Sequence, residues 1–131
     1  RQTALQPDEL ITAVILPETN PKEIVRSYKV SKRKDLDIST VSGGFRLLLE
    51  NDTVVAITLA FGGMAAKTEC ATSAEAFLIG KKWKRETIEA AAALIRSQFK
   101  PLSDARSGAE FRSLAAGNLL LKFWTETTAK S

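Results

Sequence analysis

Residues 28–61 decide the fold, and they read YKVSKRKDLDISTVSGGFRLLLENDTVVAITLAF. Between residues 41 and 50, apolar residues alternate with polar residues or glycine except at Leu48, which is the period of a strand with one buried face. Asn51 and Asp52 tolerate the positive φ of a tight turn and separate this run from a second one. The second run is expected to bury Val55, Ile57, Leu59 and Phe61. Together the two runs predict a β-hairpin that holds the charged loop of residues 29–37 in place.

Composition limits the kinds of protein that this chain can be. With 131 residues, 44% of them hydrophobic, it is long enough for one domain with a core that needs neither disulfides nor metal. The chain has one cysteine, Cys70, and no histidine. These counts exclude a disulfide framework, a Cys-x-x-Cys metal site and a histidine triad. Any iron–sulfur or zinc chemistry is therefore expected elsewhere.

The hydropathy of the chain and its first residue give two expectations about the whole protein. No apolar run approaches the roughly 20 residues that span a bilayer, and the first residues are too polar for a secretory signal. We therefore expect a soluble, cytoplasmic protein without a membrane span. The chain opens on Arg1, and its one methionine is Met64, so we expect a fragment or a processed chain whose partners lie upstream.

The net charge of +4 raises the question of nucleic acid, because clustered Lys and Arg neutralise phosphates. The cations are spread over residues 32–34, residues 81–85 and single sites, with acids between them. No aromatic stacking motif lies on either predicted strand of the hairpin. We expect no nucleic-acid partner. The alternative, a nonenzymatic basic binding module whose loop 32–34 contacts phosphate or nucleic acid, stays open.

Two further strands are predicted outside the hairpin. Residues 10–16 are apolar on both faces, which predicts a strand that is either covered on both sides or covered on one side by a neighbour in the full protein. Residues 24–30 carry Ile24, Tyr28 and Val30 in phase, interrupted by Arg26. The pair Gly62-Gly63 ends the hairpin, where a bulge or turn, or a close approach of another group, is expected.

Three helices are expected after the hairpin. The first and third begin at candidate capping boxes, which are Thr72 with Glu75 and Ser107 with Glu110. Gly80 ends the first, Pro101 ends the second, and Gly117 marks close packing in the third. Apolar residues at helical spacing in the second are Ile88, Ala91, Ala92, Ile95 and Phe99, and in the third Phe111, Leu114, Ala115, Leu119 and Trp124. Strands followed by helices predict an α+β fold, with the helices on one face of an antiparallel sheet.

No strong catalytic signature emerges from this pattern. The glycine doublets at residues 43–44 and 62–63 lack the spacing of a nucleotide-binding turn that opens a helix. Asp35 and Asp37 read either as a carboxylate pair for acid–base work or as a solvated salt-bridge network. Trp83 and Trp124 read either as packing or interface residues or as a ligand platform.

Three motifs in fixed order carry a family resemblance. They are residues 28–33 (YKVSKR) followed by Asp37-Ile38-Ser39, residues 41–46 (VSGGFR), and residues 60–65 (AFGGMA). This order resembles the C-terminal domain of the flavoprotein subunit of molybdenum hydroxylases, a group that includes xanthine dehydrogenase, aldehyde oxidase and aerobic carbon monoxide dehydrogenase. The opening residues 5–17 and the helical tail are also similar to that domain, so the resemblance covers nearly the whole chain.

The resemblance implies a three-stranded antiparallel sheet packed against three C-terminal helices, forming a single domain over residues 1–131 of a longer flavoprotein subunit. It implies an upstream domain that grips the FAD pyrophosphate, and molybdenum–pterin and 2Fe-2S centres on partner subunits or domains. Electrons would pass from the iron–sulfur clusters through FAD to NAD or another acceptor. The implied class is an oxidoreductase, in which the present chain alone is not expected to be active.

The resemblance also implies site residues. Lys29 matches a lysine at the strand end that faces the flavin, where a cation stabilises negative charge on the reduced ring. Arg33 and Asp37 match the loop beside the isoalloxazine, and Ile38 packs behind it. No catalytic residue and no metal ligand is implied. Animal xanthine dehydrogenases tend to carry an acid where this chain has Leu36, which leaves the use of NAD and any switching of the loop open.

Overall fold

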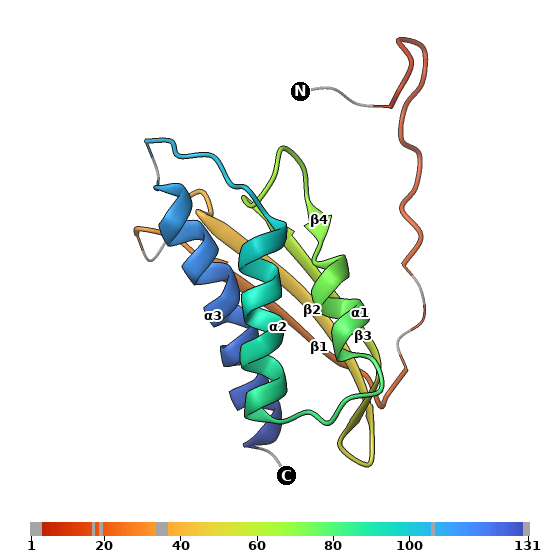
Figure 1. Cartoon of the computed structure of the whole chain (residues 1–131). Helices are drawn as coiled ribbons and strands as arrows, with labels where there is room; N and C mark the ends of the chain where they lie inside the picture. The colour runs from red at the N-terminus through yellow and green to blue at the C-terminus, as the bar shows by residue number, and fades with distance from the viewer. Residues whose placement is uncertain (1–3, 17, 19, 34–36, 106, 130–131) are drawn as a thin grey trace.

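The structure is a computed structural model that describes residues 4–16, 18, 20–33, 37–105 and 107–129. The strands described are β1 (Ile24–Val30), β2 (Val41–Glu50), β3 (Thr53–Gly62) and β4 (Glu69–Cys70), and the helices are α1 (Thr72–Leu78), α2 (Arg85–Gln98) and α3 (Ala109–Thr128). The strands form one antiparallel sheet in the order β1-β2-β3-β4, with the helices on one face (Figure 1). The predicted α+β class is confirmed. The sheet has a fourth strand beyond the three expected, because the two-residue β4 pairs with the end of β3.

The hairpin of β2 and β3 forms as predicted. Asn51 and Asp52 have φ values of 48° and 58°, the left-handed conformation that a two-residue hairpin turn requires. The turn is anchored to the segment before α2, because the Trp83 amide donates to the Asp52 carbonyl at 2.8 Å. The Lys82 ammonium donates to the Asn51 carbonyl at 2.6 Å. Turn chemistry and tertiary contacts therefore specify the same register.

The expected burial of Val55 is wrong. The pairing shifts between Leu48 and Leu49, so that Leu48 faces Ala56 while Leu49 faces Val54. Val55 is the extra residue of this β-bulge and is 42% exposed, whereas Val54 is 1% exposed. A bulge reverses which residues face the core, and the break in alternation at Leu48 marks it.

The core lies between the sheet and the helices, and an aromatic cluster forms its centre. The ring of Phe123 on α3 lies 5.5 Å from Phe45, 5.8 Å from Trp83 and 6.3 Å from Tyr28, measured between centroids. Trp83 is buried, and the Trp124 indole N–H donates to the Trp83 carbonyl at 3.4 Å. Both tryptophans therefore make packing contacts within this chain.

Neither predicted capping box forms. The N-cap of α1 is Ala71, not Thr72, and the Glu75 carboxylate instead accepts from the Leu59 amide of β3 at 2.7 Å. The N-cap of α3 is Gly108, without a side-chain hydrogen bond. Other side chains serve the first turns, and at α1 the Ser73 amide donates to the Gln98 side chain of α2 at 3.0 Å. The first turn of α3 is met by the Ser103 hydroxyl, which accepts from the Ala109 amide at 2.9 Å.

The buried face of α3 differs from the expected one. Phe111 and Leu114 are 52% and 48% exposed, while Arg112 is 5% exposed. A guanidinium tolerates burial only where acceptors surround it, and hydropathy alone does not reveal those acceptors. The packing role of Gly117 is confirmed, because an added Cβ would lie 2.7 Å from the Arg96 Nε.

The strand predicted over residues 10–16 is not formed within this chain. The segment has no regular secondary structure and runs away from the sheet (Figure 1). Its large apolar side chains are 69% to 91% exposed, and they are Leu10, Ile11, Val14, Ile15 and Leu16. No strand of the described sheet pairs with its backbone. Among the described residues, no helix combines the length and the apolar composition that a membrane crossing requires.

Candidate functional site

The loop between β1 and β2 gathers three of the four predicted site residues. Arg33, Asp37 and Ile38 line one pocket of about 260 Å³. The remaining lining residues are Lys32, Thr40 and Ala105. The loop is short and bounded by two paired strands, which explains why these side chains meet. Residues 34–36, including Asp35 and Leu36, lie outside the described residues.

Hydrogen bonds within the loop fix the carboxylate of Asp37. Its Oδ2 accepts from the Arg33 amide at 3.1 Å, and its Oδ1 accepts from the Ile38 amide at 3.0 Å. The Arg33 guanidinium lies 3.6 Å from the same carboxylate. The bond from the Arg33 amide, together with the charge of the guanidinium, lowers the pKa of the Asp37 carboxyl. Asp37 is therefore an anion that shapes the loop at neutral pH, not a proton donor.

The rim of the pocket combines apolar surface with positive charge. Ile38 is 61% exposed, and the side chains of Lys32 and Arg33 are also exposed. An apolar contact flanked by cations suits a planar ring system that takes up negative charge. This arrangement fits the edge of a flavin.

Lys29 lies apart from this pocket. Burial alternates along β1, so the exposed Lys29 is on the opposite face from Tyr28 and Val30, away from the helices. Its neighbours across the sheet are Ser42 and Gly62. Lys29 is thus a cation on the helix-free face of the sheet.

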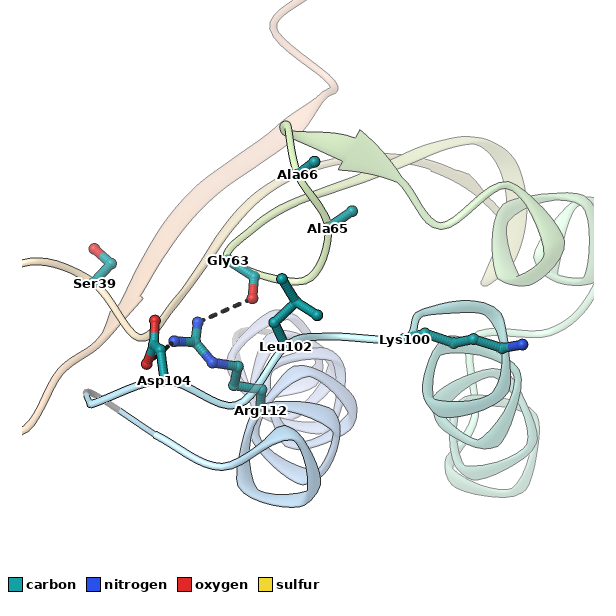
Figure 2. A pocket seen from close by; sticks show the side chains of 8 residues that line it. All are labelled: Ser39, Gly63, Ala65, Ala66, Lys100, Leu102, Asp104 and Arg112. Carbon is teal, nitrogen blue, oxygen red and sulfur yellow. Dashed lines mark hydrogen bonds and ion pairs between the residues drawn. The ribbon is translucent and has the colours of Figure 1, made fainter. Parts of the chain in front are cut away.

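A buried cation beside the site that sequence reasoning missed is Arg112. Its guanidinium donates to the carbonyl of Thr40. It also donates to the Gly63 carbonyl at 3.0 Å and to the Asp104 carboxylate at 2.8 Å (Figure 2). A usable signal was present, since Arg112 is in helical phase with the buried Ala116 and Phe123. A cation in the apolar stripe of a helix predicts a buried acceptor cluster.

Arg112 also borders a second, larger cavity of about 450 Å³. Its lining residues are Ser39, Gly63, Ala65, Ala66, Lys100, Leu102, Asp104 and Arg112 (Figure 2). The cavity lies between the turn after β3 and the connection from α2 to α3. The described residues contain no group of three or more His, Cys, Asp or Glu side chains arranged to hold a metal ion.

The described helices offer no cradle for a pyrophosphate. Their N-caps are Ala71, Lys84 and Gly108, and none is preceded by the spaced glycines that let backbone amides surround phosphate. The residues present therefore fit the ring of a flavin, not the whole of FAD.

Comparison with known proteins identifies the family of this chain. Residues 26–127 match the family model described as CO dehydrogenase flavoprotein C-terminal domain. The chain belongs to this family. All four predicted site residues fall within the matched range of this flavoprotein C-terminal domain, and the resemblance inferred from the three motifs is confirmed.

Relatives of the domain are parts of much longer proteins. Xanthine dehydrogenase 1 of Arabidopsis thaliana is 35% identical over 129 residues, covering 95% of this chain and 10% of the relative. A nicotinate hydroxylase of Emericella nidulans is 36% identical over 137 residues, covering 99% of this chain and 10% of the relative. The chain thus spans about a tenth of the length of these relatives.

Solved structures share the fold of the domain. Carbon monoxide dehydrogenase from Hydrogenophaga pseudoflava superposes with a TM-score of 0.75 at 25% identity, covering 80% of this chain and 36% of that chain. Quinoline 2-oxidoreductase from Pseudomonas putida gives a TM-score of 0.72 at 24% identity, covering 81% of this chain and 37% of that chain.

Proposed function

We propose that this chain is the C-terminal domain of the FAD-containing part of a molybdenum hydroxylase, an oxidoreductase resembling xanthine dehydrogenase. In this role it helps to pass electrons from iron–sulfur clusters through FAD to NAD or another acceptor. The observation that carries the proposal is the family match over residues 26–127. Relatives named xanthine dehydrogenase and nicotinate hydroxylase, each similar over nearly the whole chain, support it.

The loop pocket is the part of this chain that faces the flavin. FAD supplies the redox chemistry when bound. Arg33 at the loop pocket provides positive charge that stabilises negative charge on the reduced ring, and Lys29 is a second candidate cation, on the helix-free face of the sheet. Ile38 excludes water from the ring edge with its exposed apolar side chain, and Asp37 keeps Arg33 and Ile38 in place through the loop hydrogen bonds.

An upstream domain is the expected partner. It holds the FAD pyrophosphate, for which the described helices of this chain have no cradle. The exposed apolar residues of segment 10–16 support this pairing, because a segment with two apolar faces is stable when added to the sheet edge of a neighbour. Molybdenum–pterin and 2Fe-2S centres belong to further domains or subunits, and the assembly is cytoplasmic.

The test uses the full-length polypeptide that contains this chain, purified without its partners. We expect a flavin absorption spectrum that bleaches on reduction. The Lys29→Met variant should lower the flavin reduction potential by about 30 mV, equivalent to roughly 1.4 kcal/mol for a two-electron couple, or weaken FAD affinity tenfold. Lys22→Met is the matched control, because Lys22 is an exposed lysine in the turn that precedes β1, whereas Lys29 lies near the other end of that strand.

Three outcomes separate the parts of the proposal. A colourless polypeptide that gains no flavin when FAD is added rejects the function and favours the basic phosphate-binding module. An unchanged potential and affinity in Lys29→Met removes Lys29 from the site. Ile38→Ser then tests the pocket by itself, because it replaces the exposed apolar contact without altering charge. A normal flavin spectrum and a normal FAD affinity in that variant would exclude the pocket from the flavin site.

A further inference from the structure

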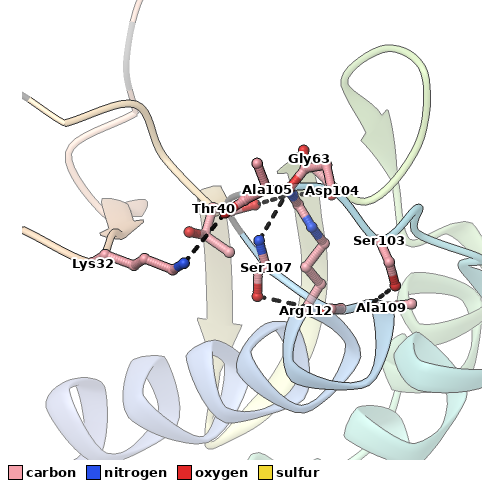
Figure 3. Close-up of polar contacts among 10 residues, drawn as sticks. Lys32, Thr40, Gly63, Ser103, Asp104, Ala105, Ser107, Ala109 and Arg112 are labelled. Atoms are coloured by element: carbon pink, nitrogen blue, oxygen red, sulfur yellow. Dashed lines mark hydrogen bonds and ion pairs between the residues drawn. The ribbon is translucent and has the colours of Figure 1, made fainter.

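Arg112 joins the start of α3 to three other segments, two of which are far away in the sequence. From the first turn of α3 it reaches Thr40, at the end of the loop that lines the pocket, and Gly63, just after β3 (Figure 3). It also pairs with Asp104 in the connection between α2 and α3. The side chain is 5% exposed, so these acceptors are what compensates the desolvation of its charge.

Gly63 shows independently that this junction is closely packed. Its φ is +80°, and a Cβ built on it would lie 2.3 Å from the Thr40 carbonyl oxygen and 3.1 Å from the Arg112 Nη1. A larger residue at this position would therefore displace both groups. The absence of a side chain at residue 63 lets the guanidinium approach the loop.

The junction connects directly to the wall of the loop pocket. Thr40 lines that pocket and is 2% exposed, and its amide donates to the Val30 carbonyl at 2.7 Å. Ala105, from the connection between α2 and α3, lines the same pocket and accepts from the Lys32 ammonium at 3.4 Å. Arg112 thus holds two parts of the pocket wall. It bonds Thr40 directly, and through Asp104 it holds the segment that carries Ala105.

We propose that Arg112 is a positioning residue for the loop between β1 and β2. It holds Thr40, in the wall of the loop pocket, so that Arg33 and Ile38 present a fixed surface to the flavin ring. This inference rests on the proposed function. Arg112 does not line the loop pocket, so it acts through Thr40 and the connection that carries Asp104. Disturbing the junction should therefore change the flavin environment even though no group in contact with the flavin has been altered.

The experiment compares two glycine variants in the full-length polypeptide. Gly63→Ala inserts a methyl group into the junction, whereas Gly80→Ala places one in open space at a similar φ of +74°. Both add the backbone strain of a left-handed alanine, and only the first contacts the Thr40 carbonyl and Arg112. Arg112→Gln removes the charge and the forked donors at the junction itself. The readouts are the flavin absorption and circular dichroism spectra, FAD affinity, and the rate at which ferricyanide oxidises the reduced flavin.

We expect Gly63→Ala and Arg112→Gln each to change FAD affinity or the oxidation rate roughly tenfold, the scale at which a small misplacement of a positioned group acts. Gly80→Ala should match the wild type in every flavin readout. Arg112→Lys should restore only part of the effect, because the three donors of an ammonium share one nitrogen and cannot replace the planar fork that reaches its acceptors through Nη1 and Nη2. Flavin spectra, affinity and rate in Gly63→Ala and Arg112→Gln that equal those of Gly80→Ala would overturn the proposal.

Two further outcomes are distinguished by the design. If Gly63→Ala and Arg112→Gln fail to fold, Asp104→Asn decides, since Asp104 has a half-exposed side chain and lies outside the loop pocket. A wild-type flavin environment in a folded Asp104→Asn protein then rejects the positioning role. A wild-type polypeptide that binds no flavin rejects the proposed function itself, and with it this inference.

Discussion

Replacement of Phe123 by alanine should destabilise the domain more than any exposed substitution on the same helix. The side chain is fully buried and contacts rings from β1, β2 and the segment before α2. Deleting a buried phenylalanine side chain typically costs about 3–5 kcal/mol, because transfer energy is lost and a cavity remains. The three ring contacts place the expected loss at roughly 4 kcal/mol, near the middle of that range.

Phe111→Ala is the matched control, since it removes the same atoms from the same helix. Phe111 is 52% exposed, so about half of the burial energy of a phenylalanine is at stake, roughly 1 kcal/mol. Phe123→Leu keeps most of the buried volume and should lie between the two, at about 1.5 kcal/mol.

Urea denaturation of the chain measures these differences. With an m-value of roughly 2 kcal/mol/M, a loss of about 4 kcal/mol lowers the midpoint by about 2 M. The control should lower it by about 0.5 M. Equal midpoints for Phe123→Ala and Phe111→Ala would refute the assignment of the aromatic cluster as the centre of the core.

Three smaller predictions concern single groups. Burial raises the pKa of the Tyr28 phenol, and the hydrogen bond that it donates to Glu126 at 2.7 Å adds to this. Because its folded pKa exceeds the unfolded value of about 10, this stabilisation is complete below pH 10 and is lost progressively as the pH rises above it; Tyr28→Phe should flatten the decline of the melting temperature between about pH 10 and 11.5. Burial also raises the pKa of the Cys70 thiol, with the charge of Glu75 as the next cause, so Cys70 should react more slowly than free cysteine with a disulfide reagent at pH 8, and Glu75→Gln should accelerate it. Asp52→Gly should raise the urea midpoint by the equivalent of about 0.5–1 kcal/mol, because φ is 58° at this turn position, and a lower midpoint would contradict the turn assignment.

Local sequence patterns predicted those parts of the fold that local forces determine. The hairpin turn follows from Asn51 and Asp52, whose side chains tolerate the conformation on their own. The capping box at Thr72 failed because the Glu75 carboxylate bonds an amide 16 residues earlier, on β3. Such a competition between a local and a distant partner is settled by tertiary packing, which the sequence does not display.

The same distinction applies to the candidate site. Arg33, Asp37 and Ile38 meet because one short loop carries them, so a motif within that loop was enough to find them. The junction at Arg112 draws on segments separated by up to 72 residues, and no motif spans them. Only the helical phase of Arg112 with buried residues of α3 pointed towards it.

The two faces of the sheet explain how one small domain can serve both its own stability and a partner. The face under the helices carries the large buried side chains, including Phe45 and Phe61. On the opposite face, the side chains around Lys29 are small, because the neighbours of Lys29 across the sheet are Ser42 and Gly62. A Cβ added to Gly44 would meet nothing within 4 Å. Farther along the sheet, that face is occupied by the ion pair of Arg46 with Glu23.

A sheet face with small side chains and no helix above it is the kind of surface that another layer covers in α+β assemblies. The apolar segment 10–16 leaves the body of the domain, exposed and without a strand partner among the described residues, and requires the same kind of cover. One neighbouring domain can satisfy both demands while holding the flavin against Lys29 or the loop pocket. Because Lys29 lies on the helix-free face, whereas the loop pocket includes Ala105 from the connection between α2 and α3, the relative effects of Lys29→Met and Ile38→Ser on the flavin would reveal which of the two sites that domain covers.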